Sequence, residues 1–282
     1  MKVNIVQGLF LLIIFFLIVS TIDGKKKCQK RASGSKTFEA FDNEGPEIQM
    51  DSSINVRNPI QDIYFWPNLI ENELNIIKDA FHQIQRRTCL IFNVLDYKPW
   101  YHADRWESDK PYVIIRKSKK LTGYSDNNIE EINRRSILYL TDNALTYPSF
   151  NTSRGMVMNQ IVRFMGLKEE LYRPDAASYV RATNGENIPH RNPQFTNAQL
   201  QWPFDPESIT VPFSANNKYE LTRYCPARKT HDLGAGQRVG LLTRWDAVKI
   251  NSMFCPMSIG YADPRMGPCV VERKTKKVIT IF

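Results

Sequence analysis

The side chains that could bind a metal are widely separated in this chain of 282 residues. The histidines and cysteines are His82, His102, His190, His231, Cys28, Cys89, Cys225, Cys255 and Cys269. No two histidines lie within five residues of each other, so no pair can face one ion from successive turns of a helix. The sequence also has no CxxC pair, and no GxSxG, GxxxxGK or GxGxxG motif. Spacing alone therefore indicates neither a metal site nor a nucleophile or phosphate site.

Apolar periodicity predicts the elements that would position any site. Leu74, Ile77, Phe81 and Ile84 recur at three- and four-residue steps, which predicts a helix from Glu71. We expect His82 to be structural because it lies close to this apolar face, and His102 to be a surface or packing residue. Short apolar runs predict strands over 89–95, which we expect to be buried, and over 112–115 and 136–140.

Two further helices are predicted in the second half of the chain. One should span about 153–165, because Val157, Ile161 and Phe164 share a face, and Gly166 is well placed to end it. The other should span about 243–254, where Thr243 and Asp246 have the spacing of a capping box. The pattern predicts a mixed α+β domain over about 58–255.

The segment 159–180, NQIVRFMGLKEELYRPDAASYV, resembles the signature HExxHxxGxxHExxRxDRDxYV of the astacin zinc metalloproteases. The matching residues are Gly166, Glu170, Arg173, Asp175, Tyr179 and Val180, and Asn187-Ile188 follows where the family has its next Asn-Ile or Asn-Val. Blocks at 236–255, 88–89, 57–58 and 66–67 are also similar to the family, so the resemblance covers about 57–255. It implies a zincin-like, two-lobed α+β fold, with a twisted sheet and long helices over a cleft and an irregular lower lobe.

The resemblance also implies which positions should bind zinc, and none of them keeps its chemistry. The three histidine positions hold Asn159, Arg163 and Glu169, and the general-base position holds Gln160. Arg163 stays protonated and has no lone pair, and an amide such as Gln160 cannot accept a proton near neutral pH. We therefore expect no zinc, no other cofactor and no catalytic residue.

The remaining half of the family site is altered as well. The segment 204–212 fits the frame YDYxSIMHY, with Thr210 in place of the methionine and Pro212 in place of the assisting tyrosine. We expect an Arg163–Glu169 ion pair, with Asn159 beside it, to join the elements that zinc would join. In the family, the glutamate at the Glu170 position pairs with a buried N-terminus.

The first 24 residues are typical of a secretory signal: Lys2, an apolar run over 9–19, then Ser20, Thr21 and Gly24. The run is shorter than the roughly 20 residues of a spanning helix. Retention as a signal anchor is the alternative, because three lysines follow. We expect a pro-segment or linker over 25–57, an astacin-like peptidase domain over 58–255 and a basic tail over 256–282.

Export would allow disulfides and glycosylation. The resemblance implies a Cys89–Cys255 bridge and the loss of the family's second bridge, while the pairing of Cys28, Cys225 and Cys269 stays open. Asn151 begins a glycosylation sequon, Asn-Thr-Ser. We therefore predict a secreted, extracellular glycoprotein.

Together these features predict a catalytically inactive astacin-like homologue that binds a peptide or protein along a sheet edge in the former substrate cleft, without cleavage. The alternative is a structural module that binds matrix or an anionic glycan, since 38 basic and 29 acidic residues leave a formal charge of +9. Residual metalloendopeptidase activity is the least favoured function. We expect no nucleic-acid partner and no stable membrane span.

Overall fold

A computed structural model describes residues 36–37, 49–50, 57–107, 110–121, 123–126, 135–185, 195–225 and 233–269 of the chain. The predicted signal segment, Cys28, Asn187-Ile188, His190, His231 and most of the predicted basic tail lie outside these residues. All described residues belong to one compact unit that begins at Lys36. Among them, no helix combines the length and the apolar character needed to cross a membrane.

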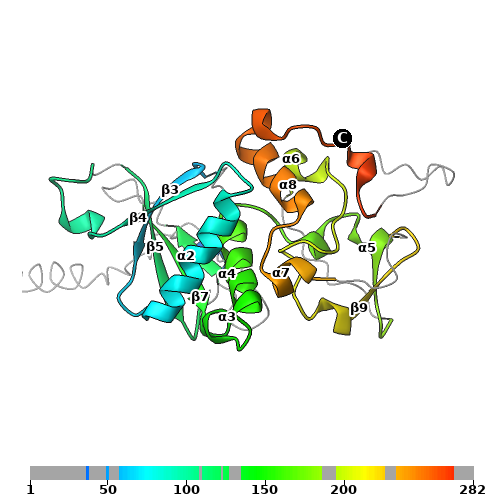
Figure 1. Cartoon of the computed structure of the whole chain (residues 1–282), viewed down its shortest axis with the longest axis horizontal. Coiled ribbons are helices and arrows are strands. Elements are labelled where there is room, and N and C mark those ends of the chain that lie inside the picture. Colours follow the sequence, from blue (N-terminus) through cyan, green and yellow to red (C-terminus); the bar gives the residue numbers. More distant parts are fainter. Residues whose placement is uncertain are drawn as a thin grey trace, which may run out of the picture. The chain divides into compact units, whose positions relative to one another are not determined.

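A five-stranded mixed sheet forms the first half of this unit (Figure 1). Its strands, in spatial order, are β4 (Ile91–Leu95), β3 (Ile60–Phe65), β5 (Tyr112–Ser118), β7 (Arg135–Thr141) and β6 (Gly123–Asp126). The first four are parallel, and β6 is antiparallel to β7 at the edge. A pair of two-residue strands, β1 (Lys36–Thr37) and β2 (Gln49–Met50), is antiparallel.

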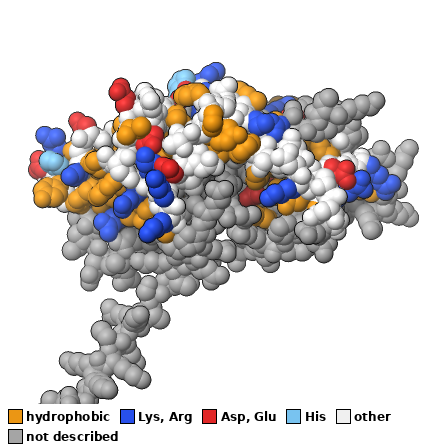
Figure 2. Space-filling model, turned by 90° about the horizontal axis from the view of Figure 1, so that it is seen from below, with side chains coloured by type: hydrophobic (Ala, Val, Ile, Leu, Met, Phe, Trp, Pro, Cys, Tyr) orange, Lys and Arg blue, Asp and Glu red, His pale blue; other side chains and the backbone are white. Residues whose placement is uncertain are grey.

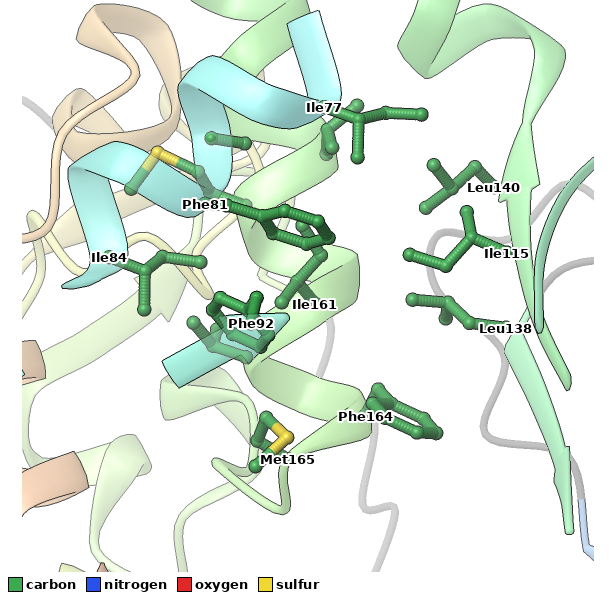
Figure 3. Close-up of a cluster of buried hydrophobic side chains, with 14 of the residues drawn as sticks. Ile77, Phe81, Ile84, Phe92, Ile115, Leu138, Leu140, Ile161, Phe164 and Met165 are labelled. Carbon is green, nitrogen blue, oxygen red and sulfur yellow. The ribbon is translucent and has the colours of Figure 1, made fainter. Parts of the chain in front are cut away.

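Two long helices pack against one face of the sheet. Helix α2 (Glu71–Gln85) and helix α4 (Phe150–Phe164) lie side by side, and their apolar side chains meet those of β5 and β7 (Figure 3). Ile77, Phe81 and Ile161 on the helices and Ile115 and Leu140 on the strands are almost completely buried. This core fixes α4, whose polar residues include the predicted site positions.

The opposite face of the sheet is covered by aromatic side chains. Tyr112 and Ile114 alternate with Val113 and Ile115 along β5, so they point to this second face. Trp100 and Trp106, from the loop after β4, pack against Tyr112. The loop therefore forms a second small core of its own, which includes the turn η1 (Pro99–Tyr101).

The rest of the chain has short elements joined by long turns. They are α3 (Asp142–Thr146), η2 (Glu170–Tyr172), α5 (Ala176–Tyr179), β8 (Val180–Ala182), α6 (Asn197–Leu200), η3 (Ala215–Asn217), β9 (Tyr219–Leu221), α7 (Ala235–Val239), α8 (Arg244–Phe254), η4 (Pro256–Ser258) and η5 (Pro264–Met266). Strands β8 and β9 pair antiparallel. Cys89 is bonded to Cys255, as the resemblance implied, and Cys225 is bonded to Cys269.

The structure confirms the mixed α+β class and all three predicted helices, with α4 beginning three residues earlier than predicted. The Ser149 hydroxyl accepts from the Thr152 amide at this earlier start, and the Thr243–Asp246 capping box begins α8 as predicted. The prediction that 89–95 forms a buried strand is wrong in part: Ile91 and Val94 are 45% and 46% exposed, because β4 lies at the sheet edge.

Candidate functional site

Helix α4 places three of the predicted site residues in the interior. Asn159, Gln160 and Arg163 are 1%, 0% and 4% exposed, although polar side chains on a helix normally face solvent. The sheet and α2 cover one side of α4, and α7 contacts another. The helix ends at Gly166, whose φ of 106° is a conformation that other residues rarely adopt. After this turn the chain reverses and returns Glu169 toward the helix.

Arg163 and Glu169 form a buried ion pair. Arg163 Nη1 lies 3.3 Å from Glu169 Oε2, and Glu169 is 6% exposed. The pairing expected from the sequence is confirmed. Asn159 does not join this pair through its carbonyl oxygen, because the buried Asn159 Oδ1 has no hydrogen-bond partner among the residues that the structure describes.

Gln160 fixes α4 to the end of β7. Its Oε1 accepts from the Thr141 amide at 3.2 Å, and its Nε2 donates to the Thr141 hydroxyl at 2.9 Å. Thr141 also caps helix α3. The Gln160 amide thus uses both its oxygen and its nitrogen in hydrogen bonds to Thr141.

These residues do not fit a zinc ion. Guanidinium groups cannot coordinate a cation, and the one carboxylate, Glu169, already pairs with Arg163. Across the described ranges, no three His, Cys, Asp or Glu side chains lie close enough together to hold a metal ion. We therefore assign no chemical step to zinc in this chain.

Glu170 is the centre of a second buried charge cluster. Its Oε1 lies 2.5 Å from Lys249 Nζ on α8, its Oε2 accepts from the Asp205 amide at 3.2 Å, and Arg173 Nη1 is 3.7 Å away. Glu170 and Lys249 are 1% and 0% exposed. The Lys249 side chain is thus a buried cationic partner of this glutamate.

The other residues of the signature near Glu170 make hydrogen bonds and ring contacts within the fold. Arg173 makes two hydrogen bonds of 2.9 Å to the Asp175 carboxylate and a third, of 3.0 Å, to the Trp202 carbonyl. Tyr179 stacks on Phe204, with the ring centroids 5.0 Å apart. Arg173, Asp175 and Tyr179 therefore have structural roles in the fold.

The segment that holds Thr210 and Pro212 lies next to this cluster. The Thr210 hydroxyl accepts from the Glu170 amide at 3.2 Å and is 2.9 Å from the Ser208 hydroxyl. Pro212 is half-buried, and its carbonyl accepts from the Ala215 amide at 2.9 Å. The structure thus brings Thr210 against the loop that carries Glu169 and Glu170.

Two buried aspartates tie this segment to α8. Asp246 accepts from the Ser208 hydroxyl at 2.5 Å and from the Ile209 amide at 2.8 Å, and Asp205 accepts from the Thr243 hydroxyl. Burial and the nearby Asp246 carboxylate raise the pKa of Asp205 to about 7. Burial also raises the pKa of Asp246. Sequence reasoning found the capping role of Asp246 but missed this pair, because the two residues meet only in the folded chain.

The remaining predicted positions lie apart from this cluster. Asn151 is exposed on the first turn of α4, and glycosylation there stays a prediction. His82 is exposed on α2, so its predicted structural role is wrong: it points away from the apolar face. His102 packs edge-on against Tyr97, with the ring centroids 5.5 Å apart, as expected of a surface or packing residue.

No protein-family model matches the sequence, and no curated protein matches it. Among solved structures, the chain is similar to high choriolytic enzyme 1, a hatching enzyme zinc-protease from the medaka fish Oryzias latipes. The identity is 15%, the match covers 78% of this chain and 94% of that chain, and the TM-score is 0.47. It is also similar to myroilysin at 11% identity, with 71% and 94% covered and a TM-score of 0.42. Since both TM-scores are below 0.5, the residue assignments rest on this chain's own motifs and contacts.

Proposed function

We propose that this chain is a secreted, catalytically inactive homologue of astacin-type proteases that binds polypeptide without cleaving it. The observation that carries the proposal is the buried Arg163–Glu169 ion pair, which joins two of the positions where the sequence motif would place zinc ligands. The Gln160 amide, held by Thr141, stands at the position of the base. Both the metal-activated water and its base would be missing.

Electrostatics argue against zinc at these positions. Two unit charges 4 Å apart interact by about 4 kcal/mol at an effective dielectric constant of 20, so a dication beside one guanidinium would be repelled by about 8 kcal/mol. Glu169 lowers this repulsion but already balances Arg163, so the pair with a dication beside it would keep two excess positive charges, and breaking a buried pair to free the carboxylate is itself costly. The ion pair and a bound zinc ion are therefore alternatives.

Two further features support binding and export. The described sheet has two edge strands: β4, which pairs only with β3 within the sheet, and β6, which pairs with β7 and also contacts β1. An extended peptide can add to a strand edge through backbone hydrogen bonds. The bonds Cys89–Cys255 and Cys225–Cys269 fit an oxidising, extracellular compartment.

The test uses the purified full chain and a library of unlabelled peptides. The chain is incubated with the library and added zinc, with and without a chelator, and the products are read by mass spectrometry. The same peptides are then measured for binding to the immobilised chain. We expect intact peptides and saturable binding. Chelator-sensitive cleavage would refute inactivity, whereas intact peptides with no binding would refute the binding role.

A further inference from the structure

The loop after β4 forms a pocket on the sheet face opposite to α2 and α4. It is lined by Tyr64, Asp96, Tyr97, Lys98, Tyr101, His102 and Arg105. Its volume is about 550 Å³ and it is open to solvent. Sites for small ligands are typically about 300–1,000 Å³ in volume. This pocket is separate from the Arg163–Glu169 region, because α4 packs on the other face of the sheet.

Aromatic contacts hold the loop that forms the pocket against the sheet. Trp100 stacks on Tyr112 at 6.0 Å and on Trp66 at 6.2 Å, and it meets the ring of Tyr64 edge-on at 5.3 Å. The Trp106 indole nitrogen donates to the Lys110 carbonyl at 3.1 Å. These inner rings hold the loop against the sheet, while Tyr101 on its outer side is 78% exposed.

Aromatic rings and cations lie next to each other in the pocket. Lys98 Nζ is 6.0 Å from the ring centre of Tyr101, and the Arg105 guanidinium is 5.8 Å from that of Tyr97. In the space-filling view, hydrophobic, basic and acidic side chains gather beside a histidine at one end of the visible face (Figure 2). A ligand with one apolar face and one anionic group would therefore meet both kinds of partner here.

The lining carries two cations that an anionic group can contact. Lys98 and Arg105 contribute +2 and Asp96 contributes −1. Asp104, outside the lining, is 3.8 Å from both His102 Nδ1 and Arg105 Nε, and with it these four formal charges sum to zero. The pocket therefore offers single cations and not a net positive charge, and a ligand with many phosphates would meet two carboxylates.

We propose that this pocket binds a sugar unit that carries a carboxylate or sulfate group. Tyrosine rings are amphipathic, with flat apolar faces and hydroxyl edges, and so match the CH faces and hydroxyls of a sugar. Arg105 and Lys98 bind the anionic group, since guanidinium forks match such oxyanions. Asp96 accepts a hydrogen bond from a sugar hydroxyl. This site does not depend on the proposed peptide binding.

The experiment is calorimetric titration of the full chain with a heparin-derived hexasaccharide and with its fully desulfated, carboxyl-reduced counterpart. The pocket variants are Tyr101→Ala and Arg105→Ala. The matched controls lie far from the pocket in sequence: Tyr261→Ala, where the residue is 88% exposed, and Arg181→Ala, where the side chain is 69% exposed against 61% for Arg105. All four residues are exposed, and thermal unfolding checks that each variant folds.

We expect each pocket variant to weaken binding of the charged hexasaccharide by roughly tenfold, which is what the loss of one charge-assisted bond or one ring contact predicts. The two controls should change the affinity by less than about threefold, as expected for general charge or surface effects. The neutral counterpart should not bind measurably.

Three results would overturn the proposal. Equal losses in Arg105→Ala and Arg181→Ala would mean general attraction to the +9 chain. Equal affinity for the neutral counterpart would mean that the anionic group is not recognised. The absence of binding by the charged hexasaccharide would mean that the pocket takes another ligand.

Discussion

At the scale of single residues, the central contact is the buried ion pair between Arg163 and Glu169. The sequence predicted their pairing because both align with metal-ligand positions on either side of Gly166, and the structure places Nη1 and Oε2 3.3 Å apart. The sequence could not predict which partners Gln160 and Glu170 would take. Thr141 and Lys249 reach them from 19 and 79 residues away, through packing that no local pattern records.

Glu169→Gln should destabilise the chain markedly, because it leaves the buried Arg163 guanidinium without this counter-charge. Loss of one partner of a buried pair costs about 3–5 kcal/mol of unfolding free energy. The double variant Arg163→Met/Glu169→Gln should recover part of that loss, since both charges of this pair are removed together. Urea denaturation of the single and double variants measures this coupling.

The exposed pair Arg181–Glu220 is the matched control. Its side chains are 69% and 48% exposed, so Glu220→Gln should change the unfolding free energy by less than about 1 kcal/mol. If Glu169→Gln cost no more than Glu220→Gln, the ion pair would not be the element that holds α4 to its returning loop.

Asp205 should make stability depend on pH. Its pKa rises from an ordinary 3.8 to about 7 through burial and the Asp246 carboxylate, so the folded chain holds a proton that the unfolded chain releases. This contribution is complete below pH 3.8 and is lost as pH rises through about 7. The change Asp205→Asn keeps an acceptor for the Glu207 amide and removes the titration. The Thr243 hydroxyl, which donates to Asp205, loses that acceptor at every pH, so this loss does not change the pH dependence.

The free energy of unfolding is measured against pH for the native chain and for the Asp205→Asn variant. The variant should gain stability relative to the native chain as pH rises from about 4 to about 7, the window set by this shift. Parallel curves would show that Asp205 ionises in the folded chain at its ordinary pKa.

At the scale of elements, hydrophobic periodicity predicted the helices better than the strands. Helix α2 has one apolar face toward the core, which is the pattern that the sequence displays. Strand β3 was not predicted: Ile63 faces the helices and Tyr64 faces the aromatic core, so no polar alternation marks it. Strand β4 was predicted, but its position at the sheet edge was not, because the sequence does not show which strands pair with each other.

Helix α4 should tolerate no side chain at Gly155. A Cβ there would lie 1.9 Å from the Gln237 carbonyl oxygen of α7. Alanine would gain about 1 kcal/mol in helix propensity. Overpacking against backbone costs about 1–3 kcal/mol or more, so Gly155→Ala should be destabilising overall.

Gly185→Ala separates this clash from backbone strain, because Gly185 has a φ of 75° and no neighbour within 4 Å of a Cβ. It should cost about 1 kcal/mol through strain alone. Thermal unfolding of both variants measures the cost of the clash at Gly155 and the cost of the strain at Gly185. A smaller shift for Gly155→Ala than for Gly185→Ala would mean that α4 and α7 can move apart freely.

At the scale of the whole molecule, the sequence pattern predicted the α+β class, and the resemblance implied the Cys89–Cys255 bond that the structure has. They did not predict the Cys225–Cys269 bond, because three cysteines allowed more than one pairing. The aromatic pocket was missed as well, since Tyr64 and Tyr101 lie far apart in sequence and meet only when the loop folds over the sheet.

The most direct test of inactivity is the zinc content of the purified full chain after equilibration with zinc and gel filtration. We predict no stoichiometric zinc for the native chain. The variant Asn159→His/Arg163→His/Glu169→His, which restores three imidazoles at the aligned positions, is the positive control. One zinc ion per native chain would contradict the account, because zinc and the Arg163–Glu169 ion pair cannot occupy the same positions.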